Sequence, residues 1–353
     1  MTIPTTMHAW RKHKGNPVPV WEEIPVPSAP PSGFLVKLLA SGVCHSDQAL
    51  LDVEDRPQFN DVYTLGHEGC GKIVQIGVDV TDDRFKIGTR VALLAVPGCG
   101  LQSCPECSRN LAQLCPSGQH HGIGQDGFYA EYVAIEAQGA VILPDGVPPE
   151  IGAIATDAVT TAYHGIVRRA EVQPHETVFL FGLGGLGFNA LQIVVKHIGA
   201  RALVSDIRGE KLDAARDLGV PDEDIVPVHV QEEGRIAQWV VERGVHVDTV
   251  LEFVGKRQTF ADAQKVVRAG GKVLCIGTGE RVNALDMKNG IRKRLSFIFS
   301  YGGQYRDLEE VLALIKEGIL KPRVRRGALR DFPRYLKELG EGGIEDRVAL
   351  TPE

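Results

Sequence analysis

The sequence lacks several features that would place it in a specialised class of protein. It has no run of about eighteen apolar residues and no apolar segment behind its first basic residues, so we expect neither a membrane-spanning helix nor a secretory signal. It also lacks an excess of positive charge: 45 Asp and Glu residues against 39 Lys and Arg residues leave a formal net charge of −6. That balance argues against nucleic acid or an anionic membrane as a partner. A chain of 353 residues without repeats predicts a soluble, cytoplasmic protein of two domains.

Cysteine is too scarce and too unevenly placed for a disulfide framework. There are seven cysteines, an odd number, and four of them crowd into one segment as Cys99, Cys104, Cys107 and Cys115. Four thiolates with no histidine and no open position predict a closed, structural zinc site in a reducing compartment. Two disulfides, or a site with three of these ligands, are the alternatives. Cys70 and Cys275 are expected to be buried thiols.

The apolar pattern changes near residue 160. Before that point, short apolar runs separated by Gly and Pro predict short strands and irregular loops, with strands over 34–39, 72–76 and 90–95. After it, apolar strands alternate with helical stretches, which predicts a parallel, doubly wound sheet. The strands expected in that sheet cover 177–181, 202–205, 247–253, 272–276 and 295–299. A helix over 307–316 and a last strand over 347–350 follow.

A glycine motif follows the first strand of the predicted sheet and opens a helix over 188–197. It reads Gly182-Leu183-Gly184-Gly185-Leu186-Gly187. This is the dinucleotide fingerprint in the strand-to-helix context that the motif requires. The first glycine allows the tight turn, the second lets backbone approach the pyrophosphate, and the third lets helix pack on strand. The helix N-terminus offers free N–H groups to the phosphates.

An acidic residue at the end of the second strand bears on the choice of cofactor. Asp206 lies nineteen residues after Gly187. Its carboxylate would accept hydrogen bonds from the adenosine ribose hydroxyls and repel a 2′-phosphate, which favours NAD over NADP. Arg208 would instead tolerate that phosphate, and a helix cap is the plain alternative for Asp206. We expect NAD as the cofactor, contacted by Asp206, Arg208 and Lys211.

A second glycine motif carries a resemblance to a known family. The segment Gly66-His67-Glu68-Gly69-Cys70-Gly71, followed by Gly77 and Val80, resembles the zinc-site signature of medium-chain alcohol dehydrogenases. The resemblance spans about residues 10–350 and includes the spacing of Cys104, Cys107 and Cys115. Cys99 departs from it, because four residues rather than two separate it from Cys104. The family implies an α/β fold with an N-terminal GroES-like irregular β-barrel domain over 1–157 and 300–353. It also implies a Rossmann domain, with a doubly wound parallel sheet, over 158–299, and an active site in the cleft between the two.

The resemblance also implies a catalytic zinc site. Its ligands would be Cys44, His67 and Asp157, the last an aspartate where many relatives have cysteine, and Glu68 would be an intermittent ligand. Thiolate, imidazole and carboxylate all bind zinc, and one position stays open for alcohol or water. The harder carboxylate should raise the Lewis acidity of the metal. Asp47 is expected to accept from the free N–H of His67. A core thiol, a structural histidine and a helix cap are the plain alternatives.

Proton transfer and cofactor contacts follow from the same family. Ser46 resembles the hydroxyl that contacts the substrate oxygen and starts a proton relay; its plain alternative is a helix cap. Many relatives end that relay on a histidine where this chain has Ala49, so here the relay must end on ribose, water or His45. His45 also matches a position that contacts cofactor phosphate. Further cofactor contacts are implied for Thr161, Val254, Gly277 and Arg347, the last as the arginine that holds the pyrophosphate.

The function implied is that of a zinc-dependent, NAD-preferring alcohol dehydrogenase with one catalytic and one structural zinc per chain. It would interconvert a primary or secondary alcohol with its aldehyde or ketone, as a homodimer or homotetramer. A specialised enzyme for a polyol, an aryl alcohol or a biosynthetic intermediate is the main alternative, since the pocket wall near Leu93, Leu94 and Val96 lacks a bulky aromatic. The zinc ligands disfavour a zinc-free quinone or enoyl reductase, and Ser46 beside them disfavours a non-catalytic dinucleotide-binding protein. His120 and His121 are expected to be exposed loop histidines.

Overall fold

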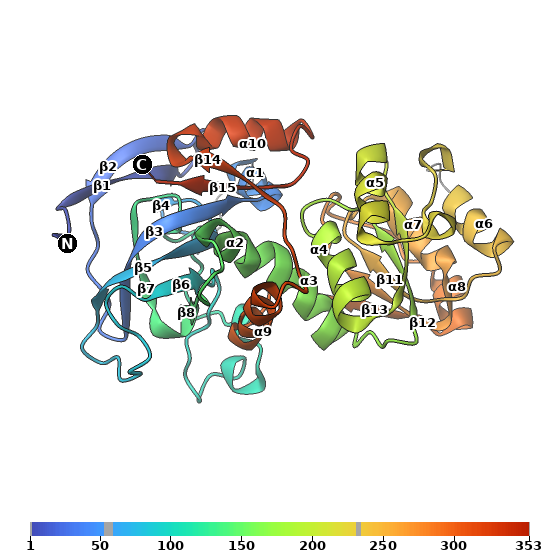
Figure 1. The fold of residues 1–353 in the computed structure, drawn as a ribbon, viewed down its shortest axis with the longest axis horizontal. Helices are drawn as coiled ribbons and strands as arrows, with labels where there is room; N and C mark the ends of the chain where they lie inside the picture. Colours follow the sequence, from blue (N-terminus) through green and yellow to red (C-terminus); the bar gives the residue numbers. More distant parts are fainter. Residues whose placement is uncertain (1, 53–58, 231–233, 353) are drawn as a thin grey trace. The chain divides into compact units, whose positions relative to one another are not determined.

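A computed structural model describes residues 2–52, 59–230 and 234–352 (Figure 1). The chain divides into two compact units. Unit 1 comprises Met1–Thr160, Gly302–Gly318 and Pro322–Glu353, and unit 2 comprises Thr161–Tyr301 and Ile319–Lys321. Among the described residues, no helix combines the length and the apolar character that crossing a membrane requires.

Unit 1 is built on two sheets of short strands, as predicted for the N-terminal region. The larger has seven strands in the order β14-β15-β3-β5-β6-β8, and β7 pairs with β3 beside that path. These strands are β3 (Gly33–Val43), β5 (Glu68–Ile76), β6 (Arg90–Leu93), β7 (Tyr132–Glu136), β8 (Ala140–Ile142), β14 (Val324–Ala328) and β15 (Arg347–Thr351). The smaller sheet has the order β2-β1-β4, made of β1 (Thr6–His13), β2 (Val20–Pro25) and β4 (Val62–Thr64). Because β15 pairs antiparallel with β3, the C-terminal tail completes the N-terminal sheet.

The core of unit 1 explains why β3 is apolar along nearly its whole length. Strand β3 pairs with β15, β5 and β7 and is buried on both faces, so the polar alternation of a half-exposed strand is missing. A separate hydrophobic cluster contains Trp10, Tyr129 and Phe332, and the ring centroids of Tyr129 and Phe332 are 4.4 Å apart. The helices of this unit are α1 (His45–Asp52), α2 (Pro149–Ile154), α9 (Tyr305–Lys316) and α10 (Phe332–Gly340), whereas α3 (Thr160–Tyr163) lies in unit 2 except for its first residue.

Unit 2 is the predicted doubly wound parallel sheet. Its five strands run in the order β10-β9-β11-β12-β13 and all pairs are parallel. The strands are β9 (Thr177–Phe181), β10 (Arg201–Ser205), β11 (Val247–Glu252), β12 (Val267–Cys275) and β13 (Ser296–Phe299). The helices are α4 (Gly187–Gln192), α5 (Gly209–Leu218), α6 (Arg235–Glu242), α7 (Arg257–Val266) and α8 (Met287–Lys293) (Figure 1). The strand order reverses at β9, so the turn after β9 is where a ligand of such a sheet binds.

Most predicted elements are found with different ends; the strands expected at 34–39 and 72–76, for example, are β3 (Gly33–Val43) and β5 (Glu68–Ile76). Two of the differences have a clear physical cause. The strand expected at 272–276 begins five residues earlier, because Val267 pairs with Val247 ahead of a register irregularity. The helix expected at 188–197 is α4 continued by a π-helical turn, Ile193–Ile198, and it ends at Gly199, whose φ of 80° suits glycine.

Candidate active site

The backbone of unit 1 brings three of the predicted metal ligands together at one end of two paired strands. Cys44 directly follows β3, and His67 directly precedes β5, which begins with Glu68. Gly42 of β3 lies opposite Glu68 of β5, so the end of one strand adjoins the start of the other. Asp157 comes from a π-helical turn, Ala155–Val159, and the hydroxyl of the next residue, Thr160, donates to the carbonyl of Ala155 at 2.6 Å. We call Cys44, His67, Glu68 and Asp157 the buried cluster.

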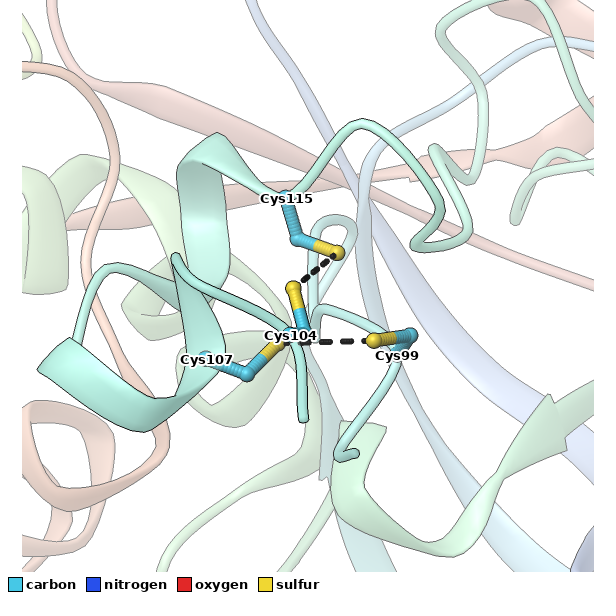
Figure 2. A group of neighbouring side chains, drawn as sticks. All are labelled: Cys99, Cys104, Cys107 and Cys115. Carbon is cyan, nitrogen blue, oxygen red and sulfur yellow. Dashed lines mark hydrogen bonds between the residues drawn. The ribbon is translucent and has the colours of Figure 1, made fainter. Parts of the chain in front are cut away.

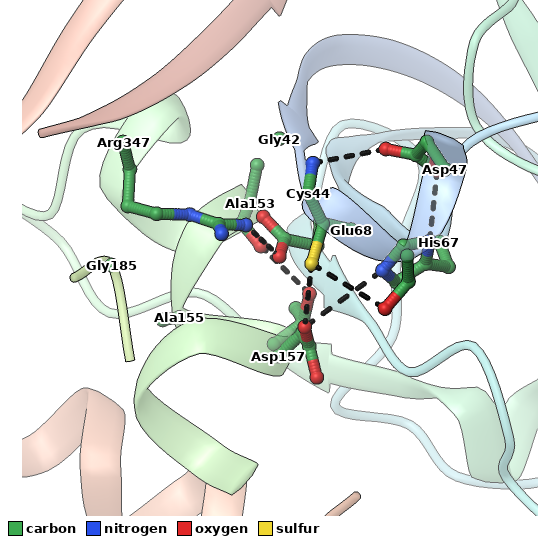
Figure 3. A network of polar contacts seen from close by, with 12 residues as sticks. Gly42, Cys44, Asp47, His67, Glu68, Ala153, Ala155, Asp157, Gly185 and Arg347 are labelled. Carbon is green, nitrogen blue, oxygen red and sulfur yellow. Dashed lines mark hydrogen bonds and ion pairs between the residues drawn. The ribbon is translucent and has the colours of Figure 1, made fainter. Parts of the chain in front are cut away.

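The donor atoms of the buried cluster are spaced to hold one metal ion. Ligand atoms of all four residues lie within 4.8 Å of one another. Cys44 Sγ is 3.7 Å and His67 Nε2 is 3.8 Å from Asp157 Oδ2 (Figure 3). Tetrahedral zinc holds such ligands about 3.4–3.8 Å apart. Cys44, His67 and Glu68 are buried, whereas the Asp157 side chain is 24% exposed. The set therefore fits zinc in both donor chemistry and spacing, and Asp157 lies on its open side.

Asp47 stands behind His67, where it was predicted. Its Oδ1 is 3.1 Å from His67 Nδ1, and its Oδ2 accepts from the backbone N–H of Cys44 at 2.9 Å (Figure 3). Oδ2 also accepts from the hydroxyl of Tyr129 at 2.6 Å. Burial lowers the pKa of His67, but the Asp47 carboxylate and the side chains of Asp157 and Cys44 beside the ring raise that pKa well above its usual value. No spacing in the sequence links residue 129 to residue 47, so Tyr129 had been assigned no role.

Glu68 forms a buried ion pair with Arg347, which begins β15 (Figure 3). Burial raises the pKa of Glu68 to about 8, although the Arg347 guanidinium opposes that rise. The other carboxylate oxygen of Glu68 is buried without a hydrogen-bond partner among the described residues. A Cβ at Gly42 would collide with this carboxylate, which explains the glycine. Binding of cofactor pyrophosphate by Arg347 stays a prediction, and its pairing with Glu68 was not anticipated.

The residues of the predicted proton relay lie on the first turns of α1. Ser46 Oγ is 3.7 Å from Cys44 Sγ, which places a hydroxyl beside the buried cluster. His45, Ser46 and Ala49 are all exposed. These three side chains of α1 therefore face solvent, whereas Asp47 on the same helix is buried behind His67.

The four cysteines of the 99–115 segment also meet, and we call them the loop cluster. Their sulfur atoms all lie within 4.8 Å of one another, with Cys99 to Cys107 at 3.7 Å and Cys104 to Cys115 at 3.6 Å (Figure 2). Those distances exceed the 2.05 Å of a disulfide and match the separation of about 3.8 Å between thiolates on tetrahedral zinc. Cys99 joins the other three despite its unusual spacing. Although burial opposes ionisation, backbone hydrogen bonds from Cys99 and Ser117 lower the pKa of Cys115 to about 7.

In unit 2, the glycine motif forms the turn between β9 and α4. Gly182 has a φ of 85°, and a Cβ on Gly187 would strike its carbonyl, so both positions require glycine. The N–H of Leu183 donates to Asp206 Oδ2 at 2.7 Å, which ties the turn to the end of β10. The other residues of the turn are Gly184, Gly185 and Leu186.

The charged residues after β10 are held by one another. Asp206 is 9% exposed, and its Oδ1 accepts from the N–H of Arg208 at 3.0 Å. Arg208 Nε lies 3.9 Å from Asp206 Oδ1 and 3.7 Å from Glu210 Oε1, so two carboxylates compensate its charge. Lys211 is buried on α5. Of the remaining predicted cofactor contacts, Thr161 is buried, Val254 is half-buried and Gly277 packs against Gly255.

The expectation for the two loop histidines was wrong. His120 is half-buried and His121 is buried. The His121 ring stacks on Phe128, with Nδ1 2.8 Å from the Asp126 carbonyl and Nε2 3.3 Å from Glu136 Oε2. The loop folds back on β7, and this long-range contact has no trace in the local sequence. Cys70 and Cys275 are buried as predicted, and burial raises the pKa of each to about 12.

Comparison with known proteins connects both units to the same group. One family model, described as an alcohol dehydrogenase GroES-like domain, matches residues 30–145, and another, described as a zinc-binding dehydrogenase, matches residues 185–317. The structure of acetophenone reductase from Geotrichum candidum in complex with NAD is 30% identical over 99% of this chain and 98% of that one, with a TM-score of 0.88. The alcohol dehydrogenase of the archaeon Aeropyrum pernix is 27% identical over 98% of this chain and 100% of that one, with a TM-score of 0.86. A Sinorhizobium meliloti protein bound to NADP, described as a zinc-binding dehydrogenase, is 25% identical over 99% and 100% of the chains, with a TM-score of 0.83.

Proposed function

Because the chain belongs to the medium-chain alcohol dehydrogenase family, we propose that it is a zinc-dependent, NAD-preferring enzyme that interconverts a primary or secondary alcohol with its aldehyde or ketone. Membership of the family makes it an oxidoreductase. The proposal of zinc dependence rests on one observation, the buried cluster, in which a thiolate, an imidazole and two carboxylates converge. The Ser46 hydroxyl lies beside that cluster.

In the proposed reaction, separate residues of unit 1 bind the metal, orient a metal ligand and transfer the proton. Cys44, His67 and Asp157 would hold zinc, which supplies a Lewis acid that lowers the pKa of the alcohol or polarises the carbonyl. Asp47 orients the His67 ring from behind. Ser46 takes up the proton of the alcohol and passes it to water, to the cofactor ribose or to the exposed His45.

NAD is the proposed cofactor because of Asp206. A buried carboxylate that already holds the N–H groups of Leu183 and Arg208 is fixed in place to accept from ribose hydroxyls. It would lie against a 2′-phosphate, whose charge it repels, and the neighbouring Arg208 is shared between two carboxylates. The solved relatives hold NAD in one case and NADP in another, so the preference depends on this residue.

The substrate class that we propose is a secondary or aryl alcohol and its ketone. The acetophenone reductase, at 30% identity over nearly the full length of both chains, supports this choice. Of the residues expected near the pocket, Leu93 belongs to the hydrophobic core of unit 1, whereas Val96 is half-buried. A polyol or a biosynthetic intermediate remains the alternative substrate.

The test is an absorbance assay of nicotinamide reduction with zinc-loaded protein. A panel of small, branched, aromatic and polyhydric alcohols would each be offered with NAD and then with NADP, and metal content would be measured in parallel. We expect two zinc ions per chain, turnover with NAD, and aryl or branched secondary alcohols ranked first. Protein that carries zinc at both clusters and turns over no alcohol would overturn the proposal.

We also propose that the chain forms a homodimer or homotetramer through unit 2. Strand β13 is the edge of the parallel sheet, and large apolar side chains are exposed on it and on α8. They include Met287 at 66%, Ile291 at 70% and Phe299 at 66% exposure. Exposed apolar groups beside an open sheet edge are typical of an interface. Sedimentation velocity should give at least twice the mass of one chain, and Ile291→Lys with Phe299→Lys should give a monomer.

A further inference from the structure

Tyr129 occupies a position that connects the core of unit 1 to the metal ligands. Its side chain is fully buried, and its ring packs against that of Phe332. Its backbone N–H donates to the carbonyl of Leu65 at 2.8 Å, two residues before the ligand His67. Gly66, with a φ of 91°, lies so close to the ring that a Cβ there would be 2.6 Å from Tyr129 Cδ1. The tyrosine therefore holds the chain that leads into His67.

The hydroxyl of Tyr129 reaches the residue behind His67. It lies 2.6 Å from Asp47 Oδ2 and 2.8 Å from the carbonyl of Gly42. One proton serves both acceptors, and the charged carboxylate is the nearer and the stronger. The same Asp47 oxygen accepts the N–H of Cys44, while its other oxygen faces the His67 ring. One buried carboxylate thus connects the hydroxyl to two metal ligands.

A buried tyrosine with a hydrogen-bonded hydroxyl is usually a simple core residue. The difference here is that Asp47 is a fully buried carboxylate, and its orientation depends on the donors around it. Removing the hydroxyl would leave Oδ2 with one fewer donor in a site where desolvation is costly. The carboxylate would then turn toward its remaining donors, and the positions of Cys44 and His67 would change with it.

We propose that Tyr129 is a positioning residue of the metal site, which acts through Asp47 to orient Cys44 and His67. The inference rests on the proposed function only in taking the buried cluster as a zinc site. It deepens that function by naming a residue outside the family's motif of ligands. The effect belongs to the hydroxyl, because the ring alone would keep the core packed.

The decisive variant is Y129F, which removes the hydroxyl and keeps the ring. We expect zinc affinity at the buried cluster to fall about tenfold, since loss of a group behind a ligand costs about 10–100-fold in affinity. The loop cluster serves as an internal control, because its affinity should not change. Cobalt substitution separates the two sites, since one thiolate and four thiolates give different charge-transfer bands, and the band of the buried cluster should shift in Y129F.

A matched control and a double-mutant cycle test the route of the effect. Y335F removes the hydroxyl of another buried tyrosine of the same hydrophobic cluster, but Tyr335 packs against Gly327 and Arg325. It should leave zinc affinity unchanged. If Tyr129 acts through Asp47, adding Y129F to D47N should cost less than twofold, whereas independent roles would give additive losses.

Each outcome decides the matter. Wild-type protein that takes up no cobalt at the buried cluster would end the proposed zinc dependence and this inference with it. Wild-type protein with a filled site and Y129F of equal affinity and spectrum would end the inference alone. An equal loss in Y335F, or a loss at both clusters, would mean a general effect on folding and would also overturn it. The Y129F spectrum is sufficient if D47N does not fold.

Discussion

The loop cluster and the buried cluster place metal-ligating side chains in unit 1 in two different ways. Cys104 and Cys115, whose sulfurs are 3.6 Å apart, are separated by 11 positions in the chain, and all four loop ligands are of one type. Cys44 Sγ and Asp157 Oδ2 are 3.7 Å apart, although the two residues are separated by 113 positions in the chain. The ligands of the buried cluster are of three chemical types: thiolate, imidazole and carboxylate. Three of the loop cysteines are only half-buried, whereas Cys44, His67 and Glu68 are buried.

The difference teaches what each site depends on. A short segment with four equal ligands can close on an ion with little help from the remainder of the unit, and it leaves no position open for chemistry. The buried cluster needs the pairing of β3 with β5, the turn that carries Asp157, and the carboxylate of Asp47. An open position on an accessible side is what a catalytic zinc site requires. Four predictions would break or sharpen this contrast.

The largest effect is expected from H67A. Loss of the imidazole should remove metal from the buried cluster only, and kcat/KM should fall at least about a thousandfold, because Lewis-acid stabilisation is worth several kcal/mol and each 1.36 kcal/mol is tenfold. The measurement is turnover together with metal content, which should drop from two ions to one. H8A, at an exposed histidine, is the control. Loss of both ions in H67A would mean that the two sites are not independent.

Alkylation of metal-free protein should distinguish the cysteines by about a hundredfold in rate. Cys99, Cys104 and Cys107 are half-buried and lose their protection when the metal leaves. Cys70 and Cys275 are buried in the cores of the two units, so the reagent cannot reach them. Peptide mapping after timed iodoacetamide treatment measures the rates, with zinc-loaded protein as the reference. Labelling of Cys70 as fast as that of the loop cysteines would show that the core of unit 1 opens when metal is removed.

C104S should separate stability from turnover. We expect loss of the loop metal, a Tm lower by roughly 5 °C, since about 2–4 °C is lost per kcal/mol in a unit of this size, and turnover at 25 °C within about threefold of wild type. C99S tests whether Cys99 is a full ligand. If it is, C99S should lose the loop metal and lower the Tm as much as C104S does. If Cys99 binds the metal more loosely, the fall in Tm should be smaller. Calorimetry and metal analysis provide the data. A large fall in turnover would mean that the loop metal contributes to the reaction and not only to stability.

The smallest effect is expected from D157C, which makes the buried cluster more like the loop cluster. A second thiolate should bind zinc more tightly and lower its Lewis acidity, so turnover should fall about threefold to tenfold while metal is retained. Steady-state kinetics with a chelator competition would measure both. A rise in turnover would mean that the carboxylate does not tune the metal in the expected direction.

Several features could be predicted because their cause is local. The strand at 177–181 was predicted with its observed ends, since a buried parallel strand is a continuous apolar run. The glycine motif after it was interpretable because turn geometry excludes other residues at Gly182. The early start of β12 and the burial of His121 were missed for the opposite reason. Both depend on a partner far along the chain, Val247 in one case and Glu136 in the other.

The sequence by itself determined the two-unit α/β architecture, the cofactor turn and the four loop cysteines, because apolar period, glycine placement and cysteine spacing act over a few residues. The buried ligands were implied only by the resemblance to the family. Only the tertiary structure decided that Cys99 joins its three neighbours, that Arg347 pairs with Glu68, and that the Tyr129 hydroxyl meets Asp47. These contacts join residues that no local period relates, and burial makes each of them matter. In a low-dielectric interior an unpaired charge or hydroxyl costs free energy, so each needs a partner, and that partner can come from any part of the chain.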